Sequence, residues 1–202
     1  MNTSKRLKFL FTVFSFGLLA TACAKREEPL PILSAIPEFS LTERSGQPFG
    51  LADLRGKIWV ADFIFTNCAG TCPIMTTALT DVQKMALAEN LDDLKLVSIT
   101  VDPERDSLEV LNRFADGYGA LKDRWYFLTG DGAVIQQLAN QGFLLSAAAS
   151  TGDSVEEPII HSNRFVLVDR QGRIRGYYDG TDEESVKLLL KDLKKLYREN
   201  AS

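Results

Sequence analysis

Apolar residues form two kinds of segment along the chain. Residues 58–65 and 94–101 are almost entirely apolar, which is typical of central strands covered on both faces of a sheet. Residues 73–89 and 107–118 instead carry their apolar side chains at helical spacing. Strands and helices that alternate in this way predict an α/β sandwich, with a central mixed sheet flanked by helices.

The other elements are predicted from turn and capping residues. Residues 39–42 and the turn at Ser45-Gly46 indicate a short N-terminal β-hairpin. Asp131 is expected to cap a helix that ends near Gln141. The remaining predictions are a strand at 124–128, a loop at 146–158, a hairpin of strands 164–168 and 174–178, and a helix over 182–198 that opens with the capping box Thr181-Asp-Glu-Glu184.

The first residues have the pattern of an export signal. A basic start precedes the uncharged run 9–22, which is shorter than the roughly 20 residues of a membrane-spanning helix. Cys23 follows, and residues 20–23 resemble a bacterial lipobox, in which the cysteine is lipidated and becomes the new N-terminus. Ala20 departs from that pattern, because its position is usually leucine. An ordinary cleaved signal and an uncleaved anchor are the alternatives, and all three place the domain outside the cytoplasm.

This interpretation divides the chain into a lipoprotein signal over 1–23, a tether over 24–36 and one domain over 37–200. The chain has a formal net charge of −4, and removing the three basic residues before Cys23 leaves −7. No block of basic residues is present, which argues against nucleic acid as a partner.

Two of the three cysteines lie four residues apart, where a predicted strand leads into a predicted helix. Pro73 suits the first helical position, so Cys72 is expected near the N-cap, where the helix dipole lowers the pKa of a thiol. A reactive pair directly after the first long strand narrows the fold to a thioredoxin-like α/β sandwich. With Cys23 set aside as an anchor, Cys68 and Cys72 remain as one functional pair.

Two thiols at this spacing allow a structural disulfide, a redox-active dithiol or a metal site. On an ideal helix, residues four apart have Cα atoms about 6 Å apart, a separation that a disulfide can bridge. A purely structural disulfide is disfavoured, because closing so small a loop would stabilise the fold little. We therefore expect a dithiol or a metal site.

His161 is the only histidine of the chain. It lies between the predicted loop and the strand 164–168, whose start lies beside the active-site cysteines in a thioredoxin-like fold. Two thiolates and an imidazole form a three-ligand set that suits Cu(I) through sulfur and Cu(II) through the added nitrogen. Zinc would accept the same atoms but normally takes a fourth ligand.

Asp102 and Asp106 follow the second long strand, at the edge of the sheet where the cysteine loop should also emerge. One interpretation is that Asp106 or Ser107 simply caps the next helix. The alternative is that the two carboxylates face the site, where they tune it or contact a partner.

Three segments in this order resemble the Sco family (the Sco/SenC group). They are Phe65-Thr-Asn-Cys-Ala-Gly-Thr-Cys-Pro73, Val101-Asp-Pro-Glu-Arg-Asp106, and His161 followed by Phe165-Val-Leu-Val-Asp169. The likeness spans residues 39–196. Members of this family are copper-binding, thioredoxin-like proteins that assist assembly of the CuA centre of cytochrome c oxidase. The resemblance implies that Cys68, Cys72 and His161 are copper ligands, and that the two cysteines also cycle to a disulfide.

The resemblance implies a copper metallochaperone rather than an enzyme. The main alternative is a membrane-anchored thiol–disulfide reductase that keeps the copper-site cysteines of the oxidase reduced. The spacing C-x-x-x-C argues against it, as does Asn163 near the position where such reductases carry a cis-proline. A thiol peroxidase fits poorly, because Ala61 stands where its proline would be, and a redox or copper sensor is a further alternative.

The partners implied are the CuA-bearing oxidase subunit and other periplasmic copper chaperones or thioredoxin-like reductants. Lipidated Cys23 would anchor the protein to the membrane. The domain is then expected in the bacterial periplasm or on the exoplasmic face.

Overall fold

The structure is a computed structural model that describes residues 28–145 and 162–199. In these residues the strands are β1 (Ser34–Ala35), β2 (Ser40–Glu43), β3 (Pro48–Gly50), β4 (Ile58–Ile64), β5 (Leu94–Thr100), β6 (Trp125–Thr129), β7 (Arg164–Val168) and β8 (Arg173–Asp179). The helices are α1 (Leu51–Leu54), α2 (Thr71–Ala88), α3 (Leu108–Gly117), α4 (Gly132–Gln137), the π-helical turn η1 (Leu138–Gly142) and α6 (Glu183–Glu199).

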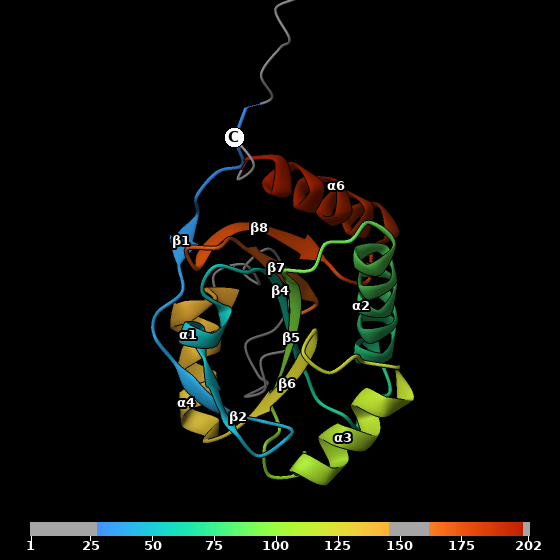
Figure 1. Cartoon of the computed structure of the whole chain (residues 1–202). Helices are drawn as coiled ribbons and strands as arrows, with labels where there is room; N and C mark the ends of the chain where they lie inside the picture. The colour runs from blue at the N-terminus through green and yellow to red at the C-terminus, as the bar shows by residue number, and fades with distance from the viewer. Residues whose placement is uncertain (1–27, 146–161, 200–202) are drawn as a thin grey trace, which may run out of the picture.

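All the strands belong to one mixed sheet, in the order β1-β8-β7-β4-β5-β6-β2-β3. β4, β5 and β6 are parallel, and the other neighbours pair antiparallel. Helices α2, α3 and α6 cover one face of the sheet, and α1 and α4 cover the other (Figure 1). The predicted α/β sandwich with an N-terminal hairpin and a closing hairpin and helix is confirmed.

The central strand β4 is buried along its whole length because it lies between two hydrophobic cores. Its alternate side chains face opposite sides of the sheet. Ile58, Val60 and Ile64 belong to the core under α2 and α6, whereas Trp59 and Phe63 belong to the core under α1 and α4. Covering both faces explains why this segment reads as a continuous apolar run.

Two predicted helix starts are wrong. Helix α2 begins at Thr71, two residues before Pro73, because proline is tolerated throughout the first turn, where N–H groups have no helical partner. Helix α6 is capped by Asp182, whose carboxylate accepts from the Ser185 N–H at 2.8 Å. The Thr181 hydroxyl donates to Asp179 instead, so it is not the cap.

The tether predicted over 24–36 is wrong for residues 30–36, which belong to the domain. Strand β1 pairs with β8, and the guanidinium of Arg175 donates to the carbonyl oxygens of Leu30 and Pro31. Arg175 also pairs with Glu199, which accepts from the Leu30 N–H at 2.6 Å. The chain is therefore fixed to the end of α6 from residue 30 onward.

The signal and the anchor residue Cys23 lie outside the described residues. Across residues 28–145 and 162–199, no helix combines the length and the apolar character needed to cross a membrane.

Candidate metal centre

Cys68 and Cys72 lie where β4 leads into α2, as predicted. Cys68 is in the loop before the helix and is partly exposed, whereas Cys72 is the second residue of α2 and only 5% exposed. Because Cys68 precedes α2, the helical spacing that we assumed for the pair does not apply. Both residues are free thiols, and the Cys72 thiol donates a hydrogen bond to the Cys68 sulfur. Two sulfurs this close suit either a disulfide or one soft metal ion.

Cys68 is the member of the pair whose thiol loses its proton more readily. Burial by itself would raise the pKa of Cys68, but hydrogen bonds from the backbone and thiol of Cys72 and from the backbone of Gly70 and Thr71 hold that pKa below its ordinary value. These backbone N–H groups belong to the start of α2, where they have no partner within the helix. The positive end of the helix therefore stabilises a negative charge on Cys68.

The prediction that the helix start lowers the pKa of Cys72 is wrong. Burial raises the pKa of Cys72 to about 12, although a backbone hydrogen bond from Phe65 opposes this rise. The Cys68 sulfur and the carboxyl group of Asp62 raise it further. Cys72 is part of the hydrophobic core under α2, so desolvation outweighs the helix dipole there.

Asp106 does not cap a helix; it binds the loop that carries Cys68. It is 1% exposed and accepts from the N–H of Thr66 at 3.1 Å, from the Thr66 hydroxyl and from the Thr100 hydroxyl. Ser107 caps α3 instead, by accepting from the Val110 N–H at 3.3 Å. Asp106 therefore joins the end of β5 to a residue two positions before Cys68.

Asp102 has a more peripheral position. Its carboxylate pairs with Arg105 at 3.1 Å, and its backbone N–H donates to the Thr100 hydroxyl at 3.0 Å. A direct role for Asp102 or Asp106 toward a metal or a partner stays a prediction.

The hydroxyls of Thr66 and Thr100 complete this network, and our sequence analysis missed them. Thr66 lies in the segment that carries the resemblance, two residues before Cys68, and this proximity was the available signal.

The third predicted ligand, His161, lies outside the described residues. Its neighbour Ser162 is buried and lines a small cavity together with Asn163, Cys72, Phe65 and Met75. Residue 162 thus lines the same cavity as Cys72.

The described residues alone supply two soft ligands. Within 28–145 and 162–199, no group of three His, Cys, Asp or Glu side chains is placed to hold a metal ion. The three-ligand set therefore stays a prediction that depends on His161.

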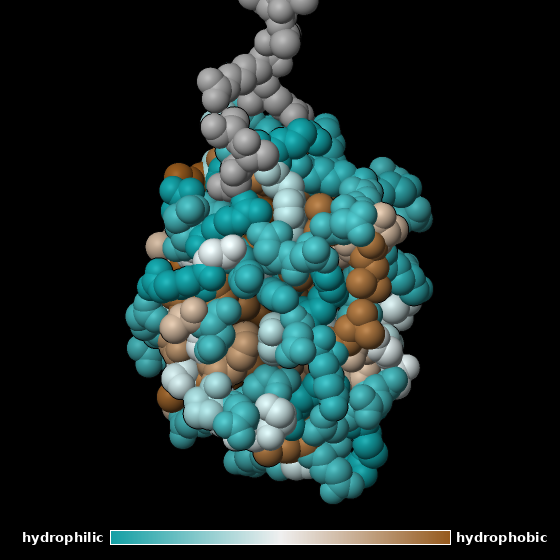
Figure 2. Space-filling model, viewed as in Figure 1, coloured by the Kyte–Doolittle hydropathy of each residue, from teal (hydrophilic) through white to brown (hydrophobic). Residues whose placement is uncertain are grey.

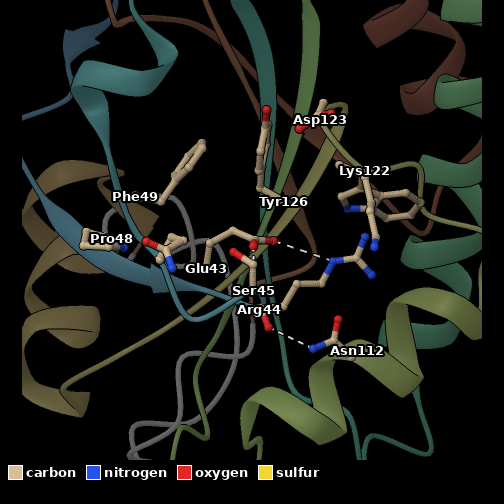
Figure 3. A pocket seen from close by; sticks show the side chains of 11 residues that line it. Glu43, Arg44, Ser45, Pro48, Phe49, Asn112, Lys122, Asp123 and Tyr126 are labelled. Atoms are coloured by element: carbon tan, nitrogen blue, oxygen red, sulfur yellow. Dashed lines mark hydrogen bonds and ion pairs between the residues drawn. The ribbon is translucent and has the colours of Figure 1, made fainter.

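A larger cavity of about 270 Å³ lies between the N-terminal hairpin and β6 (Figure 3). Arg44 lines it, paired with Glu43 at 3.6 Å, and the Arg44 carbonyl accepts from Asn112 at 2.8 Å. Lys122 and Asp123 at its rim precede the start of β6, whereas Cys68 follows the end of parallel β4. This cavity is separate from the cysteine pair, and ion pairs compensate its buried arginine.

The molecular surface in the view of Figure 2 is mainly hydrophilic, with a band of hydrophobic surface over α2. Ile74, two residues after Cys72, is 54% exposed. A molecule that reaches the cysteine pair therefore meets apolar surface beside it.

Comparison with known proteins identifies the family. The family model described as SCO1/SenC matches residues 31–198, which is most of the chain. The chain belongs to the SCO1/SenC family. A SCO1 protein homolog of Bacillus subtilis (strain 168) is 34% identical over 178 residues, covering 88% of this chain and 90% of its own.

Solved structures agree with this assignment. A SCO1/SenC family lipoprotein from Bacillus anthracis matches with a TM-score of 0.71 and 34% identity, over 81% of this chain and 95% of its own. BsSco is described as a Sco family cytochrome c oxidase assembly protein with a disulfide switch. It matches with a TM-score of 0.70 and 34% identity, over 84% of this chain and 98% of its own. Yeast Sco1 with copper bound shares the fold with a TM-score of 0.62 at 23% identity, over 80% of this chain and 90% of its own. The Sco-type, thioredoxin-like fold predicted from the sequence is confirmed.

Proposed function

We propose that this protein is a copper chaperone that binds Cu(I) and Cu(II) through Cys68, Cys72 and His161. In this role it assists assembly of the CuA site of cytochrome c oxidase. Copper is then its cargo, which must both bind and leave.

The observation that carries the proposal is the hydrogen-bonded sulfur pair at the start of α2. Cys68 is partly exposed and has a lowered pKa, and a metal that binds there can also displace the proton of Cys72. Thiolate sulfur is the ligand type that selects Cu(I). Partial exposure of Cys68 lets the thiolates of a partner enter as these ligands leave, whereas a closed site would retain the metal.

The position of Ser162 supports His161 as the third ligand. Ser162, the residue that follows His161 in the sequence, lines the same small cavity as Cys72. An imidazole nitrogen added to two sulfurs is a donor set that also accommodates Cu(II).

Anaerobic titration with Cu(II), followed by absorption and EPR spectra, tests this function. We expect one equivalent to bind with an intense sulfur-to-copper charge-transfer band, and Cys68→Ser and Cys72→Ser each to abolish the band. Cys23→Ser is the matched control, because it removes the third cysteine and leaves the pair intact. Absence of stoichiometric binding by the unaltered protein would exclude the chaperone role.

A second candidate is a thiol–disulfide reductase for the oxidase cysteines. The asymmetry of the pair favours it, because a partly exposed thiol of lowered pKa beside a buried thiol suits attack on a disulfide followed by resolution of the mixed disulfide. The two roles are separated by adding a peptide that carries a CuA-type cysteine pair in its disulfide form. Reduction of that peptide by the copper-free protein, without copper binding, would favour the reductase.

We further propose that lipidated Cys23 holds the domain at the exoplasmic face of the membrane. The Bacillus anthracis relative is a lipoprotein, and residue 30, only seven positions after Cys23, is already fixed to the domain. The CuA-bearing oxidase subunit is the proposed partner, with other copper chaperones or thioredoxin-like reductants as further ones.

A further inference from the structure

The chain enters the domain at the C-terminal end of α6. The Leu30 N–H donates to Glu199 of this helix at 2.6 Å, and Arg175 binds both residues. Figure 1 shows the first described residues beside that end of the helix. Cys23 precedes Leu30 by seven positions, and seven residues of extended chain span at most about 25 Å. A membrane that holds Cys23 therefore stays close to the end of α6.

The outer face of α6 changes its charge along the helix. The first turn carries two exposed acidic side chains, Glu183 and Glu184. The C-terminal half instead carries basic side chains on the side opposite its buried leucines, and these are Lys191, Lys195 and Arg198. Lys191 and Arg198 are exposed, and Lys195 is partly exposed.

Two of these cations are not neutralised by neighbouring side chains. The other lysines of the helix, Lys187 and Lys194, are paired with glutamates. Within residues 28–145 and 162–199, Lys191 and Lys195 form no ion pair. The chain after Cys23 has a formal net charge of −7, so this positive surface runs against the overall sign. It favours contact with an anionic surface.

Exposed apolar side chains accompany the basic ones. Leu188 is 48% exposed and lies one turn before Lys191, and along the helix it is about 16 Å from Glu199. Ile32 and Leu33, which follow the point where the chain enters, are 57% and 48% exposed. Exposed leucine and isoleucine beside lysine are the side chains that a helix places in the interface of a bilayer.

We propose that the C-terminal half of α6 is a membrane-docking surface that binds anionic phospholipid headgroups of the bilayer that anchors the protein. Lys191, Lys195 and Arg198 contact the headgroups, and Leu188 enters the interface beside them. The proposal goes beyond copper binding and rests on the proposed membrane anchor.

Docking in this way points the cysteine pair away from the bilayer. Strand β7 lies antiparallel between β4 and β8, so β4 and β8 run in the same direction. The start of β8 pairs with β1, whereas Cys68 follows the far end of β4, near the start of α6. An anionic surface attracts the C-terminal half of α6 and repels Glu183 and Glu184 at its start. The pair is then presented to a partner on the side away from the membrane.

Quenching of tryptophan fluorescence by brominated lipid tests the docking. The full chain is purified with its anchor and placed in vesicles of brominated phosphatidylcholine, with and without phosphatidylglycerol. Leu188→Trp reports on α6. Val134→Trp is the matched control, because Val134 is 42% exposed and lies on α4, which covers the opposite face of the sheet (Figure 1). The native Trp59 and Trp125 are buried and give the same background in both variants.

In vesicles with phosphatidylglycerol, we expect the tryptophan introduced at position 188 to be quenched at least about twofold more than that at 134. The difference should shrink without phosphatidylglycerol and at high salt, because screening weakens the attraction to the headgroups. Equal quenching at the two positions would overturn the proposal and leave this face to water or to a protein partner.

Reversing the charges tests the role of the lysines. Lys191→Glu together with Lys195→Glu, in the Leu188→Trp protein, should abolish the excess quenching, since each basic side chain near an anionic surface favours binding about fivefold. Lys84→Glu together with Arg113→Glu is the control, because it makes the same change in net charge on α2 and α3 and should retain the excess. Excess quenching that survives reversal of the α6 lysines would contradict the proposal.

Failure of the docking is distinguishable from failure of the proposed function. Copper titration of the same samples reads the chaperone role, and the mass of the N-terminal peptide reads lipidation of Cys23. Excess quenching in a protein that binds no copper would support docking and exclude the chaperone. Equal quenching in a lipidated protein that binds copper would exclude docking alone.

Discussion

Replacing Asp62 by Asn should change how the stability of the protein depends on pH. The pKa of Asp62 is raised by burial from 3.8 to about 7 in the folded protein, a rise of about three units. Each unit corresponds to about 1.4 kcal/mol, so ionisation of Asp62 lowers the free energy of unfolding by at most about 4 kcal/mol.

The sign follows from which state binds the proton more tightly. The folded state holds the Asp62 proton more tightly than the unfolded chain does, so the stabilisation is complete below pH 4. It is lost as the pH rises from 4 to 7, and the penalty is constant above that range. Asn carries no such proton. Its amide carries two N–H donors where the protonated carboxyl carries one O–H, and because the Oδ2 position has no partner in the described residues, the additional donor costs about 1–3 kcal/mol at every pH.

We therefore expect Asp62→Asn to be less stable than the unaltered protein at pH 4, and to gain up to about 4 kcal/mol relative to it by pH 8. Urea unfolding of the reduced protein, with a chelator present, measures this difference at each pH. Ser98→Ala is the control, because losing the hydrogen bond from the Ser98 hydroxyl to Asp62 should lower stability more at pH 8 than at pH 4. A constant difference between Asp62→Asn and the unaltered protein across this range would refute the reasoning.

Three other predictions concern residues around the site and the N-terminal segment. Asp106→Asn should lower the unfolding free energy by about 2 kcal/mol, because the hydrogen bonds from Thr66 and Thr100 weaken. Asp102→Asn, which loses only an exposed ion pair, should change that free energy by under about 0.5 kcal/mol. Urea unfolding of the two variants measures the difference. Arg175→Gln should release residues 30–36 from the domain. The amide hydrogens of Leu33 and Ile36 should then exchange faster, and unchanged exchange at these two positions would contradict the assigned contacts. Iodoacetamide at pH 7 should modify Cys68 well before Cys72, read by peptide mass spectrometry, and equal rates would contradict the pKa order of the pair.

The main elements of the fold were predictable because burial on two faces leaves a clear sequence pattern. The apolar runs became β4 and β5, and Asp131 caps α4 as expected. The docking of residues 30–36 was not predictable from local composition. It depends on Arg175, which lies 145 residues away along the chain from Leu30.

The position of the cysteine pair was more predictable than the electrostatics of the site. Spacing alone identified Cys68 and Cys72 as a pair, but which thiol loses its proton more readily depends on depth of burial, which the sequence does not reveal. Asp62 did leave a signal, as the only charged residue in the apolar run 58–65. A charge in a strand buried on both faces needs a reason, and that reasoning would have singled it out.

The central claim is that copper binds to two sulfurs and the single imidazole of this chain. Pulsed EPR of the Cu(II) complex, prepared without a polyhistidine tag, tests it most directly, because His161 is the only histidine and any imidazole nitrogen coupling must arise from it. We predict coupling to one imidazole nitrogen together with a sulfur charge-transfer band, and loss of the nitrogen coupling in His161→Ala. A Cu(II) complex of the unaltered protein without imidazole nitrogen coupling would contradict the account.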